Sequence, residues 1–328
     1  MQRHARSTHA LSRSLALAAV LALLMAACGG GGPAGDGGKE GGDAVADTID
    51  LSGVNIAVGS KEFTEQQIVG QMARLALEAA GARVDGQAIG LTGTQNVRGA
   101  LQQGRIDMYW EYTGTGWIEI LQQDELLEGS DAYYQRVKEA DAANGVVWLR
   151  PSEVNNTYAL FVGPNVDLGV QTISDLAALA RENPDRATLC AATEFIVRPD
   201  GLGGVTKAYN FEFSQVNELA LDLAINAAIQ GQRCTVGEIF QTDPQISKKN
   251  LNVLEDDQGF FPVYNLAMTI RRDAYEQHAE AYDTLFGAIT DLLDNETMIE
   301  LNGRREFEGE SFDDIARDFL VSRGIISG

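Results

Sequence analysis

The feature that most constrains this fold is a repeated switch between two hydrophobic periodicities. Residues 54–58 alternate like a strand, whereas residues 64–80 place apolar side chains at helical spacing. Strand-like segments follow at 82–89 and 106–110, with a short helix predicted between them at 95–103. The order strand–helix–strand–helix–strand favours a parallel α/β sheet.

The same pattern resumes in the second half of the chain. The predicted strands cover 158–162, 188–191, 234–240 and 251–255, and the predicted helices cover 173–181, 219–230, 275–293 and 311–323. Two α/β sets of similar size predict two lobes with a cleft between them. Ligands of open α/β sheets bind outside the carboxyl ends of the strands, and interdomain clefts are preferred small-molecule sites.

The N-terminal residues have the features of an export signal. Residues 1–27 begin with arginines and end in an apolar run that is short for a membrane span of ~20 residues, which predicts a signal peptide. Ala26 and Ala27 stand directly before Cys28, and this arrangement resembles the bacterial lipoprotein signal. The resemblance implies cleavage before Cys28 and lipidation of it. An ordinary secretory signal followed by a chance cysteine is the alternative.

Composition separates a tether from a folded body. Residues 28–50 are rich in glycine and lack aromatic side chains, so they predict a flexible tether behind the lipidated cysteine. The remainder, 51–328, is long enough for two domains. The formal charge of the whole chain is -22, which argues against a nucleic-acid partner.

Cysteine and histidine usage limits the chemistry. Cys190 and Cys234 are the only cysteines besides Cys28, and they form either one disulfide in an oxidising compartment or two buried free thiols. His278 is the only histidine after residue 27, so no histidine-based metal site and no cofactor are expected. The sequence lacks Gly-x-x-x-x-Gly-Lys-Ser/Thr, Gly-x-Ser-x-Gly and His-Glu-x-x-His, which disfavours an enzyme.

Several ordered motifs resemble those of a known family. They occupy residues 59–66, 92–94, 104–115, 156–159, 198–201, 207–211 and 256–264. Together, over residues 54–322, they resemble the substrate-binding proteins of glycine betaine, carnitine and choline importers, the OpuAC-like group. The resemblance implies an α/β type II periplasmic-binding-protein fold with a ligand cleft and two crossovers. Lobe 1 is then expected at 51–157 plus 263–328, and lobe 2 at 158–262.

The same resemblance implies an aromatic cage. A trimethylammonium group has no hydrogen to donate, and its spread charge is bound well by ring faces, at about 0.5–2 kcal/mol for each contact. The implied rings are Tyr112, Tyr158, Phe240 and Tyr264. Phe240 departs from the family, in which tyrosine is usual at this position. Tyr109 and Trp110 are nearby alternatives, and core packing is the competing explanation for every ring.

The other end of a betaine is a carboxylate, which requires positive charge and hydrogen-bond donors. By resemblance, Lys61, Thr115 and Arg198 bind it, with Arg198 reaching the ligand from the second lobe when the cleft closes. Surface ion pairs are the competing explanation for the two cations. Gln67 and Asn156 are candidate polar contacts.

These features predict a lipid-anchored, extracytoplasmic substrate-binding protein of an ABC importer. Its partners would be a membrane permease subunit and a small quaternary-ammonium ligand, with glycine betaine expected before carnitine, proline betaine or choline. An amino-acid or polyamine receptor on the same fold is an alternative, in which Glu111 beside Tyr112 would contact a polyamine. Strand alternation points Glu111 away from that ring. An osmolyte sensor without transport is a further alternative.

Overall fold

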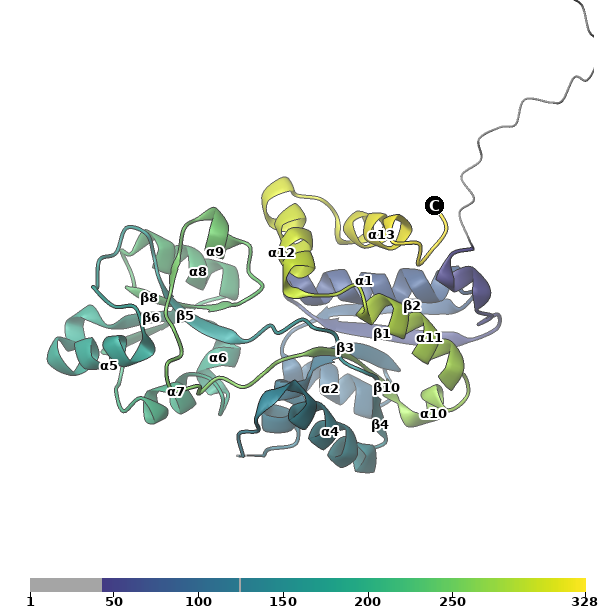
Figure 1. Ribbon diagram of the computed structural model, residues 1–328, viewed down its shortest axis with the longest axis horizontal. Coiled ribbons are helices and arrows are strands. Elements are labelled where there is room, and N and C mark those ends of the chain that lie inside the picture. The colour runs from purple at the N-terminus through teal and green to yellow at the C-terminus, as the bar shows by residue number, and fades with distance from the viewer. Residues whose placement is uncertain (1–42, 124) are drawn as a thin grey trace, which may run out of the picture. The chain divides into compact units, whose positions relative to one another are not determined.

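The computed structural model describes residues 43–123 and 125–328. The predicted signal peptide, Cys28 and most of the predicted tether lie outside these ranges. The described chain forms two five-stranded sheets, each with its own helices (Figure 1). None of the helices in those ranges combines the length and the apolar character needed to cross a bilayer.

The first sheet has the strand order β2-β1-β3-β10-β4. Its strands are β1 (Asn55–Lys61), β2 (Arg83–Leu91), β3 (Met108–Tyr112), β4 (Val146–Trp148) and β10 (Leu266–Arg271). β1 is parallel to β2 and β3, whereas β10 is antiparallel to β3 and β4. The expectation of a parallel sheet is therefore wrong for the pairs that include β10. The chain returns from the second sheet and enters the first as β10, which runs opposite to β3 and β4.

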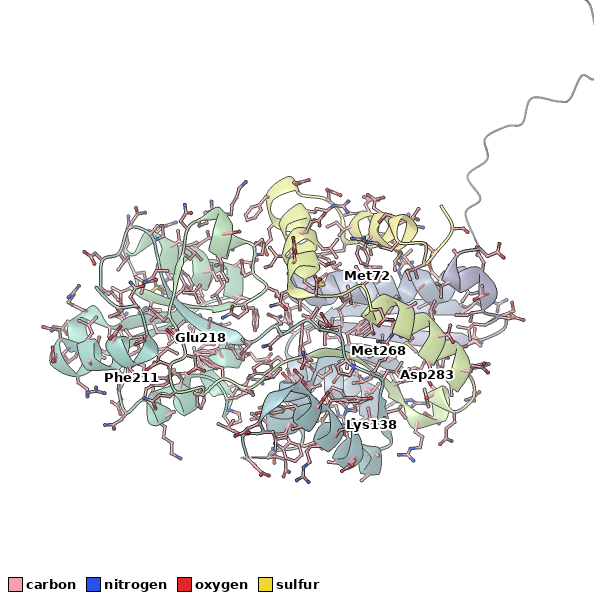
Figure 2. All side chains as sticks on the ribbon, viewed as in Figure 1. Met72, Lys138, Phe211, Glu218, Met268 and Asp283 are labelled. Atoms are coloured by element: carbon pink, nitrogen blue, oxygen red, sulfur yellow. A yellow bond between two sulfur atoms is a disulfide. The ribbon has the colours of Figure 1, made fainter. Side chains whose placement is uncertain are left out.

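Helices cover both faces of the first sheet. They are α1 (Thr64–Ala79), α2 (Thr94–Gln102), α4 (Gly129–Asp141), α10 (Arg272–Tyr275), α11 (Ala279–Thr290), α12 (Asn295–Gly303) and α13 (Phe312–Ser322). Met72 of α1 and Met268 of β10 are fully buried in the same core (Figure 2). The helix predicted at 275–293 is shorter in the structure, where α11 covers Ala279–Thr290. It begins later because the backbone of His278 is not helical, and α10 ends at Tyr275.

The second sheet has the order β7-β6-β8-β5-β9. Its strands are β5 (Tyr158–Val162), β6 (Thr188–Ala191), β7 (Gln215–Glu218), β8 (Val236–Phe240) and β9 (Asn252–Val253). Its helices are α5 (Ile173–Glu182), α6 (Thr193–Val197), α7 (Leu202–Ala208), α8 (Leu221–Gln230) and α9 (Gln245–Lys248). β6 is parallel to β7 and β8, and β5 is antiparallel to β8 and β9, so this sheet is also mixed.

Short helical turns complete the described chain. They are α3 (Thr113–Thr115), the 3-10 turns Val45–Thr48, Ala142–Asn144 and Pro184–Arg186, and the π-helical turns Gly116–Ile120 and Arg304–Glu308. A disulfide joins Cys190 of β6 to Cys234, which precedes β8. Both sulfurs belong to buried residues, so the structure has the first of the two arrangements that the sequence allowed.

The two sheets are connected by two segments that lie side by side. Asn155 forms an isolated antiparallel bridge with Asn265. The Asn156 N–H donates to the Tyr264 carbonyl at 3.1 Å. One of these segments leads directly into β5, and the other leads directly into β10. This pairing places the first residue of β5 beside the boundary between the sheets.

Candidate functional site

A cavity of about 1130 Å³ is lined by residues of both sheets and their helices. Its walls include every residue of the predicted aromatic cage, the predicted carboxylate-binding group and the predicted polar contacts: Lys61, Gln67, Tyr112, Thr115, Asn156, Tyr158, Arg198, Phe240 and Tyr264. Residues that are far apart in the chain therefore meet at one place. Their contacts with a ligand remain a prediction.

The four predicted rings lie in a cluster with a fifth. The ring centroid of Tyr158 is 5.0 Å from that of Phe240 and 5.7 Å from that of Tyr264. Phe63, which the sequence analysis missed, lies 5.3 Å from Phe240 and 6.3 Å from Tyr112. Phe63 also lines the cavity. The sequence did contain a signal for Phe63, since it is a lone apolar side chain in the polar turn before α1.

Strand pairing brings these rings together. Tyr158 is the first residue of β5 and lies directly opposite Phe240, the last residue of β8, in the antiparallel register. Directly opposed side chains stand on the same face of a sheet, about 5 Å apart. Tyr112 ends β3, and Tyr264 comes two residues before β10, its partner strand. The sequence therefore places these four rings at strand ends that face the cavity.

Tyr109 and Trp110, the nearby alternatives, do not line the cavity. Both are fully buried in the first lobe. The Tyr109 hydroxyl lies 3.2 Å from a Glu111 carboxylate oxygen, and the Trp110 ring packs edge-on against Phe286. Core packing explains both residues.

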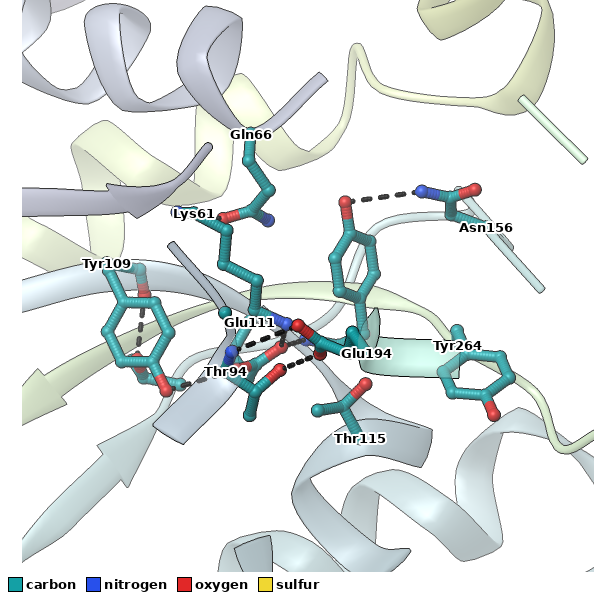
Figure 3. A network of polar contacts seen from close by, with 12 residues as sticks. Lys61, Gln66, Thr94, Tyr109, Glu111, Thr115, Asn156, Glu194 and Tyr264 are labelled. Atoms are coloured by element: carbon teal, nitrogen blue, oxygen red, sulfur yellow. Dashed lines mark hydrogen bonds and ion pairs between the residues drawn. The ribbon is translucent and has the colours of Figure 1, made fainter. Parts of the chain in front are cut away.

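Lys61 forms a buried ion pair. Its ammonium donates to Glu111 Oε1 at 2.7 Å and lies 5.2 Å from the Tyr112 ring centroid (Figure 3). Glu111 is fully buried and does not line the cavity. The carboxylate that would serve a polyamine is therefore directed at Lys61 and Tyr109, and the positive charge of Lys61 already has a partner.

Arg198 is also paired. Its Nε donates to Asp200 Oδ1 at 2.7 Å, and Asp200 accepts a further bond from the Tyr264 hydroxyl at 2.8 Å. Burial opposes the charge on Arg198, but the phenol of Tyr158 and the Asp200 carboxylate raise its pKa well above the ordinary value. Its Nη2 lies 3.4 Å from the Thr115 hydroxyl, which belongs to the first lobe. The two residues predicted to bind a carboxylate together are thus already in contact.

A second contact between the lobes involves Glu194, which the sequence analysis missed. The Thr94 hydroxyl donates to Glu194 Oε1 at 2.5 Å, and the Thr94 N–H donates to Oε2 at 3.2 Å (Figure 3). Thr94 begins α2, so the carboxylate lies at a helix N-terminus, where negative charge is favoured. Burial opposes ionisation of Glu194, but Lys61 and Arg198 outweigh it and lower its pKa.

Asn156 belongs to a polar network beneath the rings. Glu65 Oε1 accepts from the Tyr112 hydroxyl at 2.6 Å and from Asn156 Nδ2 at 3.0 Å, while Thr242 donates to Asn156 Oδ1 at 2.9 Å. Burial raises the pKa of Glu65, although these donors counteract it. The network holds the Tyr112 hydroxyl against the crossover segment. Gln67 is half-buried at the cavity wall and donates to the Glu62 carbonyl.

Two mixed α/β lobes with paired crossovers and a shared aromatic cavity define a two-lobed receptor for a small solute. The model of a family described as the substrate binding domain of ABC-type glycine betaine transport systems, OpuAC, matches residues 54–322. The chain belongs to this family.

Three known proteins illustrate the similarity. The glycine-betaine-binding protein of Pseudomonas aeruginosa is 36% identical over 81% of this chain and 86% of its own length. The ergothioneine transport permease/ergothioneine binding protein EgtU of Helicobacter pylori is 32% identical over 82% of this chain, but the match covers 48% of that longer protein. The solved structure of apo YehZ from Escherichia coli has 28% identity and a TM-score of 0.60, over 83% of this chain and 99% of its own.

These similarities establish the class of protein. The fold is the type II periplasmic-binding fold, and the chain is a substrate-binding protein of the glycine betaine, carnitine and choline ABC transporters. This is a family of transport receptors and not of enzymes, and its members work outside the cytoplasm with a small ligand and a permease.

Proposed function

We propose that the protein captures a quaternary-ammonium compatible solute, with glycine betaine as the first choice and carnitine, proline betaine and choline after it. The supporting observation is that Tyr112, Tyr158, Phe240 and Tyr264 line one cavity, with Phe63 between two of them. A methylated cation bound among these rings would gain about 0.5–2 kcal/mol from each face.

The proposed partners of the ligand carboxylate are Lys61, Thr115 and Arg198. All three line the cavity, and both cations have buried acidic partners, Glu111 and Asp200. A ligand carboxylate would therefore accept hydrogen bonds from cations whose charge is already compensated. The compensated charges reduce the difference in affinity expected between a zwitterion and choline, which has a hydroxyl in place of the carboxylate.

Cleft closure would couple capture to transport. A ligand that contacts rings and donors from both lobes binds the closed state more tightly than the open state and shifts the population toward it. The permease would recognise the closed form. We propose in addition that Cys28 is lipidated and holds the protein at the membrane surface through the predicted tether. The tether is shorter than the predicted 28–50, because Val45–Thr48 forms a helical turn and Ala46 is fully buried with its N–H bonded to the Ile325 carbonyl.

Calorimetry with a panel of solutes tests the ligand assignment. The panel is glycine betaine, carnitine, choline, ectoine, proline and putrescine. Glycine betaine should bind and Tyr158→Ala should weaken its binding roughly tenfold through the loss of one ring face, whereas Tyr134→Ala, outside the cavity, should not weaken it. Binding of proline or putrescine in place of every trimethylammonium compound would favour the amino-acid or polyamine receptor.

Ergothioneine is a second candidate ligand. It is named for the Helicobacter pylori relative, and it is itself a trimethylammonium betaine with an added heterocycle. A cavity of about 1130 Å³ has room for that larger molecule. Adding it to the panel decides between the two, because the tighter binder is the better candidate. A sensor without transport would be favoured if no permease and ATPase were encoded beside this gene.

A further inference from the structure

Glu238 is a buried acid in the wall of the cavity that the proposed function leaves without a role. It is the third residue of β8, is 2% exposed and lines the cavity. Its Oε1 accepts a hydrogen bond from the Ala192 N–H at 2.8 Å. Its Oε2 is also buried and has no hydrogen-bond partner in the described parts of the chain. A buried carboxylate oxygen without a donor is costly, and such an atom calls for a functional explanation.

The charged groups around Glu238 do not neutralise it. They are Glu194, which repels its negative charge, and Arg198, which attracts it. Arg198 is bonded to Asp200 and to Glu194. Tyr158, from the neighbouring strand β5, also faces this group. Burial, with the repulsion from Glu194, raises the pKa of Glu238 to about 8.

Glu238 stands close to the proposed cage. Side chains two residues apart on a strand share a face and are separated by roughly 7 Å, so Glu238 is the neighbour of Phe240 on the cavity face of β8. Phe240 in turn is 5.0 Å from Tyr158. These two rings pack on each other, so a cation would be held against their cavity-facing sides and not between them. There it would lie within the range at which a buried carboxylate attracts it strongly.

We propose that Glu238 is the counter-charge of the ligand's cation and that its carboxyl group releases a proton when the ligand binds. The inference rests on the proposed function. The O–H bond of the carboxylic acid breaks, the proton passes to solvent, and the carboxylate that remains faces the bound cation. No other co-reactant is needed.

The direction of the pH dependence follows from the free protein. Below pH 8 the Glu238 carboxyl is mostly protonated, and a bound cation lowers its pKa by on the order of one to two units. Binding must then drive off the proton below pH 8 but not above it. The affinity should therefore rise roughly tenfold from pH 7 to pH 9 and level off there.

Calorimetry with glycine betaine at pH 7, in phosphate and in Tris, measures the proton release on the full protein. These buffers differ in ionisation enthalpy, so the proton release appears as a difference in the observed heat. A pKa that falls from about 8 by one to two units releases about 0.4–0.8 proton at pH 7. Glu238→Gln should bind with equal heats in both buffers and with a flat pH profile. Glu218→Gln is the matched control, because Glu218 is an exposed acid on the cavity wall (Figure 2). It should keep the release.

Each outcome has one meaning. If glycine betaine binds the native protein with equal heats in both buffers, the role of Glu238 is overturned and the proposed function stands. The same holds if Glu238→Gln still releases a proton, since Glu65 or another acid would then be the source. If no trimethylammonium compound binds at any pH, the proposed function itself fails. The two-buffer result on the native protein remains decisive if Glu238→Gln does not fold.

Discussion

At the scale of single residues, Phe240 tests whether ring faces alone can hold a ligand. Phenylalanine offers a ring face without the hydroxyl that a tyrosine would carry. Phe240 is half-buried and has Tyr158 and Phe63 as ring neighbours. The side chain also lines the cavity, where a cation–π contact would require the ring and not a hydroxyl.

Phe240→Ala should weaken binding of glycine betaine by about 1–2 kcal/mol, or roughly tenfold, because one ring face is lost. Phe240→Tyr should bind within a few fold of the native protein. Titration calorimetry of both variants measures this. Equal affinity of Phe240→Ala and the native protein would remove this ring from the cage.

Arg198→Ala should destabilise the protein as well as weaken binding. Asp200 is 2% exposed and would remain in place without its cation, and breaking a buried pair costs about 3–5 kcal/mol. Denaturant unfolding of the ligand-free protein measures the loss. Arg198→Ala with Asp200→Asn should recover part of it, and a single variant as stable as the native protein would contradict the pairing.

The sequence identified positions in the site but not the pairs they form. Lys61 and Arg198 were assigned to a ligand, yet their nearest charged partners are Glu111 and Asp200. Such ion pairs depend on which parts of the chain become neighbours in the fold, and these neighbours could not be predicted from a single sequence. Glu238 did leave a signal, since an acid inside an apolar strand is unusual.

At the scale of elements, the glycine after β3 controls the position of a ring. A Cβ on Gly114 would lie 2.7 Å from the Val263 carbonyl oxygen and 2.9 Å from Tyr264 Cδ1. Only glycine therefore lets the turn carrying Thr115 pack against the second crossover. The turn and the ring of Tyr264 must occupy their places together.

Gly114→Ala should cost about 1–3 kcal/mol of stability through overpacking and should also weaken ligand binding by displacing Tyr264. Gly203→Ala in α7 is the control, because a Cβ there meets nothing within 4 Å. It should leave binding unchanged. Thermal unfolding and calorimetry of the two variants check both effects. Unchanged binding by Gly114→Ala would show that this turn does not influence the ligand site.

The disulfide should stabilise the second lobe. It joins positions 44 residues apart, and closing a loop of that length removes unfolded-state entropy worth about 2–4 kcal/mol. Cys190→Ala with Cys234→Ala should lower the melting temperature, and a reductant should lower that of the native protein but not of the double variant. Insensitivity of the native protein to the reductant would contradict this.

Elements with a clear helical period or an unbroken apolar run were predicted well. The helix predicted at 64–80 matches α1, and the apolar strand predicted at 158–162 matches β5, whose five residues are all buried. β10 was missed because Thr269 and Arg271 interrupt its apolar run, although five of its six residues are buried. Its antiparallel direction was missed as well, because strand direction depends on which strands become neighbours.

At the scale of the whole molecule, contacts between the lobes help to set how far the cleft opens. Glu194→Ala should open the ligand-free protein, because it removes both bonds to Thr94. Small-angle scattering should then give a larger radius of gyration, and ligand should reduce it. Glu218→Ala is the control on the same lobe. An unchanged radius for Glu194→Ala would show that these bonds do not influence closure.

The described chain starts and finishes at neighbouring points of the first lobe (Figure 1). The Val45 N–H donates to the Gly324 carbonyl at 3.0 Å, and the Ala46 N–H donates to the Ile325 carbonyl at 2.9 Å. A dye or a surface attachment placed at either of these points would therefore track the same half of the receptor. Joining them through a short linker and cutting at Gly169, an exposed loop residue of the second lobe, would give a circular permutant that can be immobilised by its other half.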